Sequence, residues 1–105
     1  MVLYSVTVTI DADVEREWLD WMTRVHVPEV VATGCFSECR IHKVIDSEAG
    51  DSTYVLQYRA ASLAEYQRYR DSFAAALQKD HTDRFAGRFR ASRQLLEEIA
   101  HVSGN

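Results

Sequence analysis

Apolar residues follow a two-residue period in some segments of this chain and a helical period in others, and the order of these segments limits the fold. Residues 2–10 alternate cleanly, which predicts a half-buried strand. Looser alternation predicts further strands over 35–45, 53–60 and 89–95. Helical spacing falls in the two long intervals between strands, over 14–26 and from 63 to about 85. The predicted order is therefore β-α-β-β-α-β.

Residues that favour turns and helix ends support these boundaries. Asp11 and Asp13 can each offer a side-chain acceptor to the first amides of a helix. Pro28 lacks an amide hydrogen and disfavours helical geometry at the residue before it, so the first helix is predicted to end or kink near His26. The apolar stripe predicted for this helix comprises Val14, Trp18, Trp21, Met22 and Val25.

Two further signals organise the rest of the chain. Polar residues 46–52 predict a turn that joins two strands as a hairpin. Ser62, followed three residues later by Glu65, predicts a capping box at the start of the second helix.

This order of elements in about 100 residues is typical of the ferredoxin-like α+β fold, a four-stranded antiparallel sheet with both helices on one face. We expect one domain over residues 1–100 and a short tail over 101–105. Leu3 and Val55 fall on the face opposite the helices, which predicts that this face is too apolar to stay in water. Homodimerisation through the sheets is the expected consequence.

Composition argues against several classes of partner. The 12 basic and 16 acidic side chains give a net charge of -4, which opposes binding to nucleic acid or to an anionic membrane. No apolar run approaches the roughly 20 residues that span a bilayer, and no basic leader begins the chain. Cys35 and Cys39 on one strand would lie ~13 Å apart, too far for a disulfide. Free thiols suit a reducing compartment, so a cytoplasmic location is expected.

A group of residues around the first helix resembles a known superfamily. Trp18-Leu19-Asp20-Trp21-Met22, followed by His26-Val27-Pro28-Glu29 and Gly34, is similar to the dimeric α/β-barrel proteins. The EthD-like and antibiotic-biosynthesis monooxygenase-like groups carry a comparable helix, and the EthD-like group ends it in a His-x-Pro element. With Leu77-Gln78, His81 and Arg84-Phe85, residues 1–99 most resemble a small bacterial family of domains of unknown function. This resemblance implies a dimer whose sheets close into a barrel, a cleft between helices and sheet, and no settled activity.

The candidate site residues each have a functional and a structural interpretation. His26 can act as an acid or base because an unperturbed imidazole titrates near pH 6.5, or it can simply bond the last carbonyls of a helix. Trp21 can stack on an aromatic ligand or pack in the core. Tyr58 and Arg93 can orient an enolate or a carboxylate, or they can stabilise a sheet and a dimer seam. His81 joins the ligand-binding candidates from the second helix.

The sequence offers little support for a metal or a cofactor. His26, His81 and Glu29 can in principle gather around a metal ion, but their spacing does not require one. Paired histidines at helical spacing, a Cys-x-x-Cys motif and a glycine-rich phosphate loop are all missing from the sequence. We therefore expect no metal and no cofactor.

Two hypotheses about function follow from these residues. The first is a cofactor-independent oxygenase or isomerase that acts on an aromatic or enolisable molecule in a cleft beside His26. The second is a non-catalytic module that binds a small ligand or a protein partner. The fold alone does not separate them.

Overall fold

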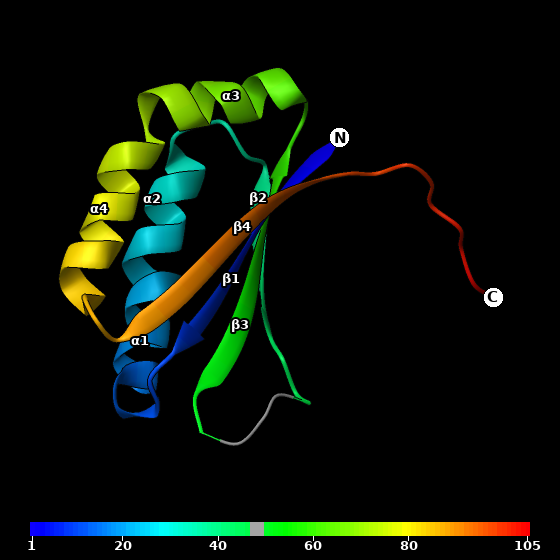
Figure 1. The fold of residues 1–105 in the computed structure, drawn as a ribbon. Helices are drawn as coiled ribbons and strands as arrows, with labels where there is room; N and C mark the ends of the chain where they lie inside the picture. Colours follow the sequence, from blue (N-terminus) through cyan, green and yellow to red (C-terminus); the bar gives the residue numbers. More distant parts are fainter. Residues whose placement is uncertain (47–49) are drawn as a thin grey trace.

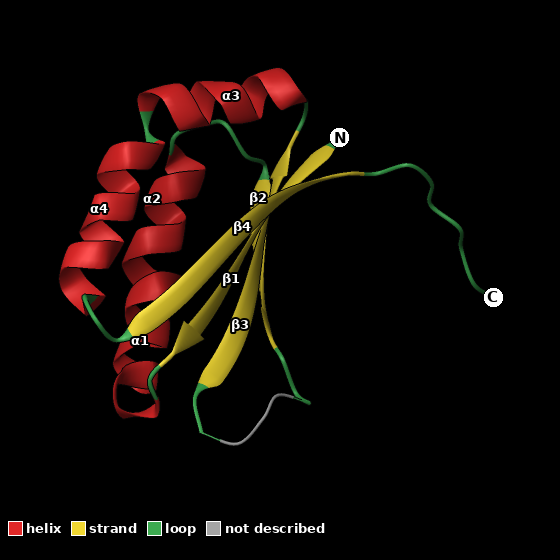
Figure 2. Ribbon diagram, in the orientation of Figure 1, coloured by secondary structure: helices red, strands yellow, loops and turns green. Residues whose placement is uncertain are grey.

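The computed structural model describes residues 1–46 and 50–105 and contains a four-stranded antiparallel sheet with its helices on one face (Figures 1 and 2). The strands lie side by side in the order β2-β3-β1-β4. Their bounds are β1 Val2–Ile10, β2 Glu38–Lys43, β3 Ser52–Ala60 and β4 Phe89–Glu97. The predicted ferredoxin-like α+β fold is confirmed. Part of the turn predicted over residues 46–52 lies outside the described residues.

The helical segments occupy the two intervals that the periodicity indicated. The first interval contains a 3-10 turn at Ala12–Val14, α1 at Glu15–Trp21, a π-helical turn at Met22–His26 and α2 at Val27–Ala32. The second contains α3 at Leu63–Ser72 and α4 at Ala74–Phe85. Residues 98–105 follow β4 as an extended tail that leads away from the helices (Figure 1).

Of the predicted end or kink near His26, the structure shows an interruption and not an end: a π turn closes at His26, and the helix resumes as α2 through Pro28 to Ala32. Pro28 lies in the first turn of α2, where a missing amide is tolerated. The wider π turn just before it relieves the clash between a proline ring and the preceding carbonyl. The extra residue in this turn also changes which side chains of the helix face the core. Val25, predicted to be buried, is 39% exposed.

Two other predicted elements are shorter than expected. The helix predicted to run from 63 to about 85 is broken at Phe73, whose φ of -129° is not helical. The strand predicted over 35–45 is limited to Glu38–Lys43. Cys35 and Phe36 precede this strand and are buried in the core instead. Cys35 and Cys39 are both free thiols, as predicted.

Asp11 and Asp13 do not cap the first helix as predicted, since neither side chain bonds a helix amide. Both bind Arg88 instead, at 2.8 Å from Asp11 and 3.4 Å from Asp13. This contact ties the entrance of the first helix to the turn before β4. The acidic residues at this position thus join two distant segments of the chain.

Ser62 caps α3, as predicted, by accepting a hydrogen bond from the Glu65 amide at 3.3 Å. The reciprocal half of the capping box is not formed, because the Glu65 carboxylate binds Arg68. We expect the substitution Ser62→Ala to lower the free energy of unfolding by about 1 kcal/mol, since it leaves a helix amide without this acceptor. Urea denaturation measures the difference. Ser62→Asp, which keeps an acceptor, should restore most of it.

Side chains of the sheet alternate between the helical layer and the open face. Tyr4, Val8, Leu56 and Tyr58 point into the core that the helices cover. The open face carries few aliphatic side chains, Leu3, Val55 and Leu96, among many serines, threonines and glutamines. This face is less apolar than the sequence predicted, because the residues beside Leu3 on β1 are Ser5, Thr7 and Thr9.

Candidate functional site

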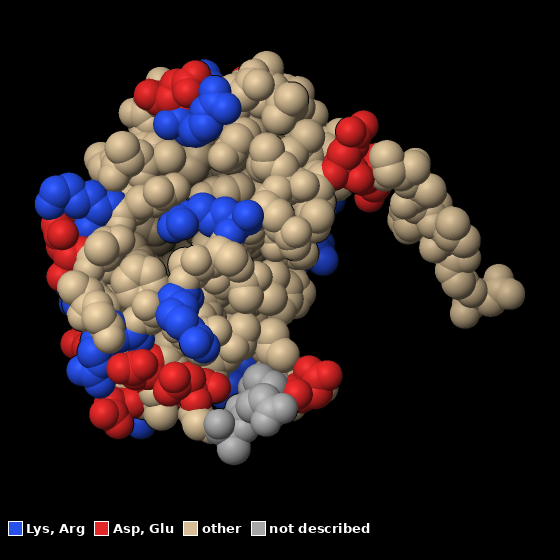
Figure 3. Space-filling view, in the orientation of Figure 1, with Lys and Arg blue, Asp and Glu red and all other residues tan. Residues whose placement is uncertain are grey.

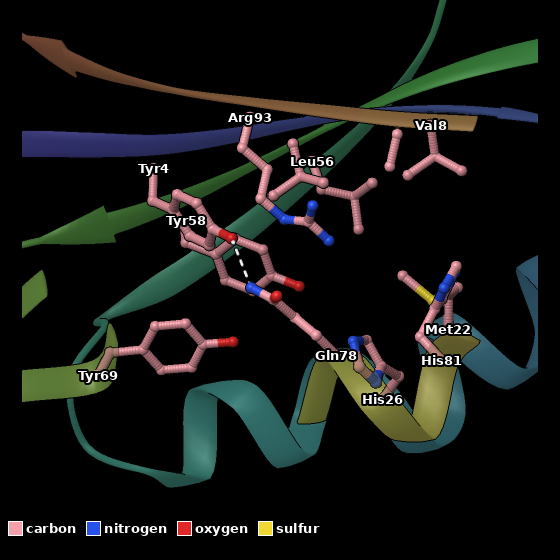
Figure 4. A pocket seen from close by; sticks show the side chains of 12 residues that line it. Tyr4, Val8, Met22, His26, Leu56, Tyr58, Tyr69, Gln78, His81 and Arg93 are labelled. Carbon is pink, nitrogen blue, oxygen red and sulfur yellow. Dashed lines mark hydrogen bonds between the residues drawn. The ribbon is translucent and has the colours of Figure 1, made fainter. Parts of the chain in front are cut away.

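A cleft lies between the sheet and the helical layer, and it brings together residues from β1, β3, β4, the π turn, α3 and α4 (Figure 4). Its enclosed space measures about 40 Å³, enough for a few water molecules or part of a small ligand. The lining residues are Tyr4, Val6, Val8, Met22, His26, Leu56, Tyr58, Tyr69, Gln78, His81, Ala91 and Arg93. The residues that β4 contributes, Ala91 and Arg93, are exposed, so the cleft opens beside this edge strand.

His26 comes from the π turn and is 8% exposed. Its ring stacks on Trp21, with centroids 4.9 Å apart and planes inclined by 25°. Burial lowers the pKa of His26, and the charge of Asp80 opposes this shift only in part. Within the described residues the imidazole makes no side-chain hydrogen bond, and no fully buried polar side-chain atom there lacks a partner. The ring nitrogens of a largely neutral His26 are therefore not fully enclosed, and the ring lines the cleft.

His81 comes from α4 and lies beside His26, with ring centroids 5.7 Å apart. The indole nitrogen of Trp18 donates a hydrogen bond of 2.8 Å to Nε2 of His81. Burial lowers the pKa of His81 to about 4, with smaller contributions from His26 and Arg93. Because an indole only donates, Nε2 carries no proton, and the neutral ring holds its hydrogen on Nδ1.

Arg93 projects from β4 toward the helices in Figure 4. No carboxylate of the described residues lies within 4.0 Å of its guanidinium. Figure 3 shows basic side chains on the face of the molecule that β4 presents, with acidic side chains gathered below them. Arg93 therefore places an uncompensated positive charge at the entrance to a largely apolar cleft.

Three tyrosines form the opposite end of the cleft. The rings of Tyr4 and Tyr58 lie 5.8 Å apart, and those of Tyr4 and Tyr69 lie 5.9 Å apart. Gln78 donates a hydrogen bond of 3.4 Å to the Tyr4 hydroxyl (Figure 4). Burial raises the pKa of all three phenols, while the charge of Arg93 opposes the shift at Tyr4. These hydroxyls stay protonated and can donate hydrogen bonds to a ligand.

The structure brings the sequence-predicted site residues together. His26, Tyr58, His81 and Arg93 all line the cleft, and Trp21 lies behind His26 as a stacking partner. The guanidinium of Arg84 lies 5.2 Å from the Trp21 ring on the outer side. Trp21 therefore supports His26 from outside the cleft lining, and whether any of these five residues binds a ligand remains a prediction.

Sequence reasoning missed several residues of this site. Tyr4, Tyr69 and Gln78 line the cleft, but Tyr4 was predicted only as part of a strand and Tyr69 only as part of the second helix, and Gln78 was named in the family resemblance without a role in the site. Trp18 was predicted to be a core residue, which is correct at 0% exposed, yet it also fixes the tautomer of His81. One available signal was the spacing of Gln78 and His81, since residues three apart share a helix face.

Over residues 1–46 and 50–105, no group of three His, Cys, Asp or Glu side chains is placed to hold a metal ion. Among the described helices, none has the length and apolar character needed to cross a bilayer.

Solved structures share this fold at low sequence identity. A dimeric ferredoxin-like protein from an uncultured marine organism has a TM-score of 0.70 and 14% identity, covering 99% of this chain and 100% of that chain. An EthD family protein from Bacillus halodurans has a TM-score of 0.65 and 13% identity, covering 94% and 100%. A mutant of SnoaB, a cofactor-independent oxygenase from Streptomyces nogalater, has a TM-score of 0.69 and 10% identity, covering 98% of each chain. These likenesses define the class, the ferredoxin-like α+β proteins.

The family is identified from the amino-acid sequence and not from the fold. Residues 1–99 match the family described as Domain of unknown function (DUF4286), and the chain belongs to this family. No curated protein sequence shows significant similarity to it.

Proposed function

We propose that this protein is a homodimer that binds a small aromatic or enolisable molecule in the cleft beside His26. The observation that carries the proposal is the convergence of polar groups on an apolar space. Two neutral imidazoles, three phenols and one guanidinium meet the side chains of Val6, Val8, Met22 and Leu56. Small-molecule sites have this composition, mostly apolar walls with a few placed polar groups.

His26 gives the cleft the capacity for proton transfer. A neutral imidazole that lines the cleft can accept a proton from an acidic C–H or O–H of the ligand and return it at another atom. This chemistry needs no cofactor, and it is the isomerisation or activation step of an enolisable compound. SnoaB, which shares the fold, is described as a cofactor-independent oxygenase. That likeness in fold is compatible with such chemistry here.

A non-catalytic role is the second candidate, and the small volume of the cleft favours the form of it in which the surface binds a protein. The enclosed space of about 40 Å³ is far below the roughly 300–1,000 Å³ of pockets that hold drug-sized ligands. In this alternative the same residues bind a small ligand, or the surface binds a protein, and His26 moves no proton. Ligand binding without turnover distinguishes this role from catalysis.

The dimer is proposed on the open face of the sheet. All helices lie on the other face, so no helix covers the open face of β1 and β3 (Figure 2). Related folds include proteins described as dimeric ferredoxin-like. The free thiols and the bacterial sources of several of these folds support a cytoplasmic, bacterial setting.

We expect light scattering at micromolar concentration to give twice the chain mass of 12.0 kDa. Replacing Val55 with Asp should shift the protein toward the monomer, because it places a charge in the middle of the proposed interface. Val25→Asp, at an exposed helical position, is the matched control and should leave the mass unchanged. A wild-type protein that is monomeric under these conditions would overturn the dimer.

Binding is tested by tryptophan fluorescence with a panel of small aromatic acids and quinones. Because Trp21 stacks on His26, a ligand in the cleft should change its emission. The variant Trp21→Phe should lose most of the signal change while calorimetry still detects binding. If no compound binds at millimolar concentration to a folded wild-type protein, the proposed function fails.

A further inference from the structure

The cleft contains two hydrogen-bond donor groups that are not paired with a carboxylate of the described residues, and they come from opposite walls. One is the Nδ1–H of His81 on α4, and the other is the guanidinium of Arg93 on β4, which also donates toward the Tyr4 hydroxyl. Their arrangement indicates the charge of the ligand. This inference rests on the proposed function of the cleft.

The first donor is fixed by Trp18. Its indole N–H donates to Nε2 of His81, which leaves Nδ1 as the protonated nitrogen of the neutral ring. His81 is 7% exposed, yet its Nδ1 makes no hydrogen bond within residues 1–46 and 50–105. Since no fully buried polar side-chain atom of the described residues is unsatisfied, Nδ1 is not fully enclosed, and the His81 side chain lines the cleft. The Trp18 contact thus prepares a neutral donor for a ligand.

The second donor brings a full charge. Arg93 extends from the sheet toward the helix that carries Gln78 and His81 (Figure 4). The other lining residues supply no carboxylate, so the charge has no counter-ion in the cleft. The cleft groups on which its charge acts are the phenols of Tyr4 and Tyr69 and the imidazole of His81, and none of them is an acid that could neutralise it. An arginine placed in this way is suited to a carboxylate, which it can bind through two parallel hydrogen bonds.

We propose that the cleft selects an organic acid whose carboxylate binds between the Arg93 guanidinium and the His81 Nδ1–H. The ring or chain of the acid then lies against Leu56 and Met22. In this arrangement Trp18 is a positioning residue that acts through His81. The ligand supplies the negative charge that the cleft lacks.

The proposal is tested with benzoate and benzamide, which share a shape and differ in charge. We expect benzoate to bind the wild-type protein at least tenfold more tightly than benzamide, as measured by calorimetry or by NMR titration. The variant Arg93→Gln should bind benzoate at least tenfold more weakly than the wild type does, and its affinity for benzamide should stay within twofold of the wild type. Arg93→Lys keeps the charge but not the paired geometry, so its affinity for benzoate should lie between those of the wild type and of Arg93→Gln.

The matched control is Arg90→Gln. Arg90 lies on the same strand but on the open face, paired with Thr9, so the variant removes one positive charge without altering the cleft. Its affinity for benzoate should stay within twofold of the wild type, and light scattering checks that its assembly is unchanged. If Arg90→Gln lowers the affinity for benzoate as much as Arg93→Gln does, the arginines act through long-range electrostatics and the proposed carboxylate site is wrong.

The role of Trp18 has its own readout. In Trp18→Phe the indole donor is lost, so the ring ¹⁵N shifts of His81 should report a mixture of tautomers in place of a single Nδ1–H form. The affinity for benzoate should fall as the share of the Nδ1–H tautomer falls. A single unchanged tautomer in the folded variant would overturn the positioning role.

The outcomes separate the two proposals. If benzoate and benzamide bind equally, the cleft is a ligand site and the carboxylate inference fails. If neither these two nor any compound of the wider panel binds, the proposed function itself fails.

Discussion

Replacing Trp18 with alanine should lower the free energy of unfolding by about 3–5 kcal/mol, the range for removing a large aromatic side chain from a core. Trp18 is 0% exposed and packs against Tyr54, with ring centroids 5.0 Å apart. The substitution leaves a cavity between helix and sheet, and it also removes the hydrogen bond to His81. A buried imidazole nitrogen without its donor adds to the loss.

Urea denaturation followed by far-ultraviolet circular dichroism measures this effect. Val25→Ala on the same helical segment is the control, since Val25 is 39% exposed and should change stability by less than about 0.5 kcal/mol. A loss of under about 1 kcal/mol for Trp18→Ala would contradict the central packing position of this residue.

Acid should destabilise the protein well before its carboxylates are protonated. The pKa of His81 is about 4 in the folded protein and about 6.5 in the unfolded chain, so the unfolded chain binds more protons between these values. The contribution of His81 is therefore complete above pH 6.5 and is lost as the pH falls toward 4. His26, whose pKa is also lowered, acts in the same direction. After allowance for screening in the cleft, we expect His81 to account for about 2 kcal/mol.

Unfolding free energies at pH 7.5, 5.5 and 4.5 test this prediction. His81→Gln keeps an acceptor for the Trp18 indole but does not titrate, so its stability should depend less steeply on pH than that of the wild type. His42→Gln, at an exposed histidine on β2, should follow the wild type. Parallel pH profiles for all three proteins would show that His81 is not held neutral by burial.

The fold could be predicted from the sequence because its signals are local. Strict alternation over residues 2–10 indicates β1, one of the two inner strands, and the order of strand and helix periods indicates the topology. The errors arise where tertiary contacts override local signals. Asp11 binds Arg88 from the other end of the chain rather than a nearby amide, and no spacing indicates that pairing.

The candidate site was predictable only in part. His26 stood out because of the His-x-Pro pattern, but this pattern is compatible both with a helix end and with a π turn that accommodates Pro28, and the sequence does not distinguish the two. The hydrogen bond from Trp18 to His81 joins residues 63 positions apart, so the tautomer of His81 cannot be inferred from sequence. The sequence could predict that Arg93 binds an anion, but only the structure shows that Arg93 has no acidic partner in the cleft.

The most direct test of the proposed ligand cleft is an NMR titration of His26 with and without a bound aromatic acid. We expect the His26 ring to titrate below its ordinary pKa in the free protein. The His26 ring and the Trp21 indole signals should also shift together when ligand is added, because the two rings are stacked. An imidazole that titrates at about 6.5 and is unmoved by every compound of the panel would show that His26 does not border a ligand cleft.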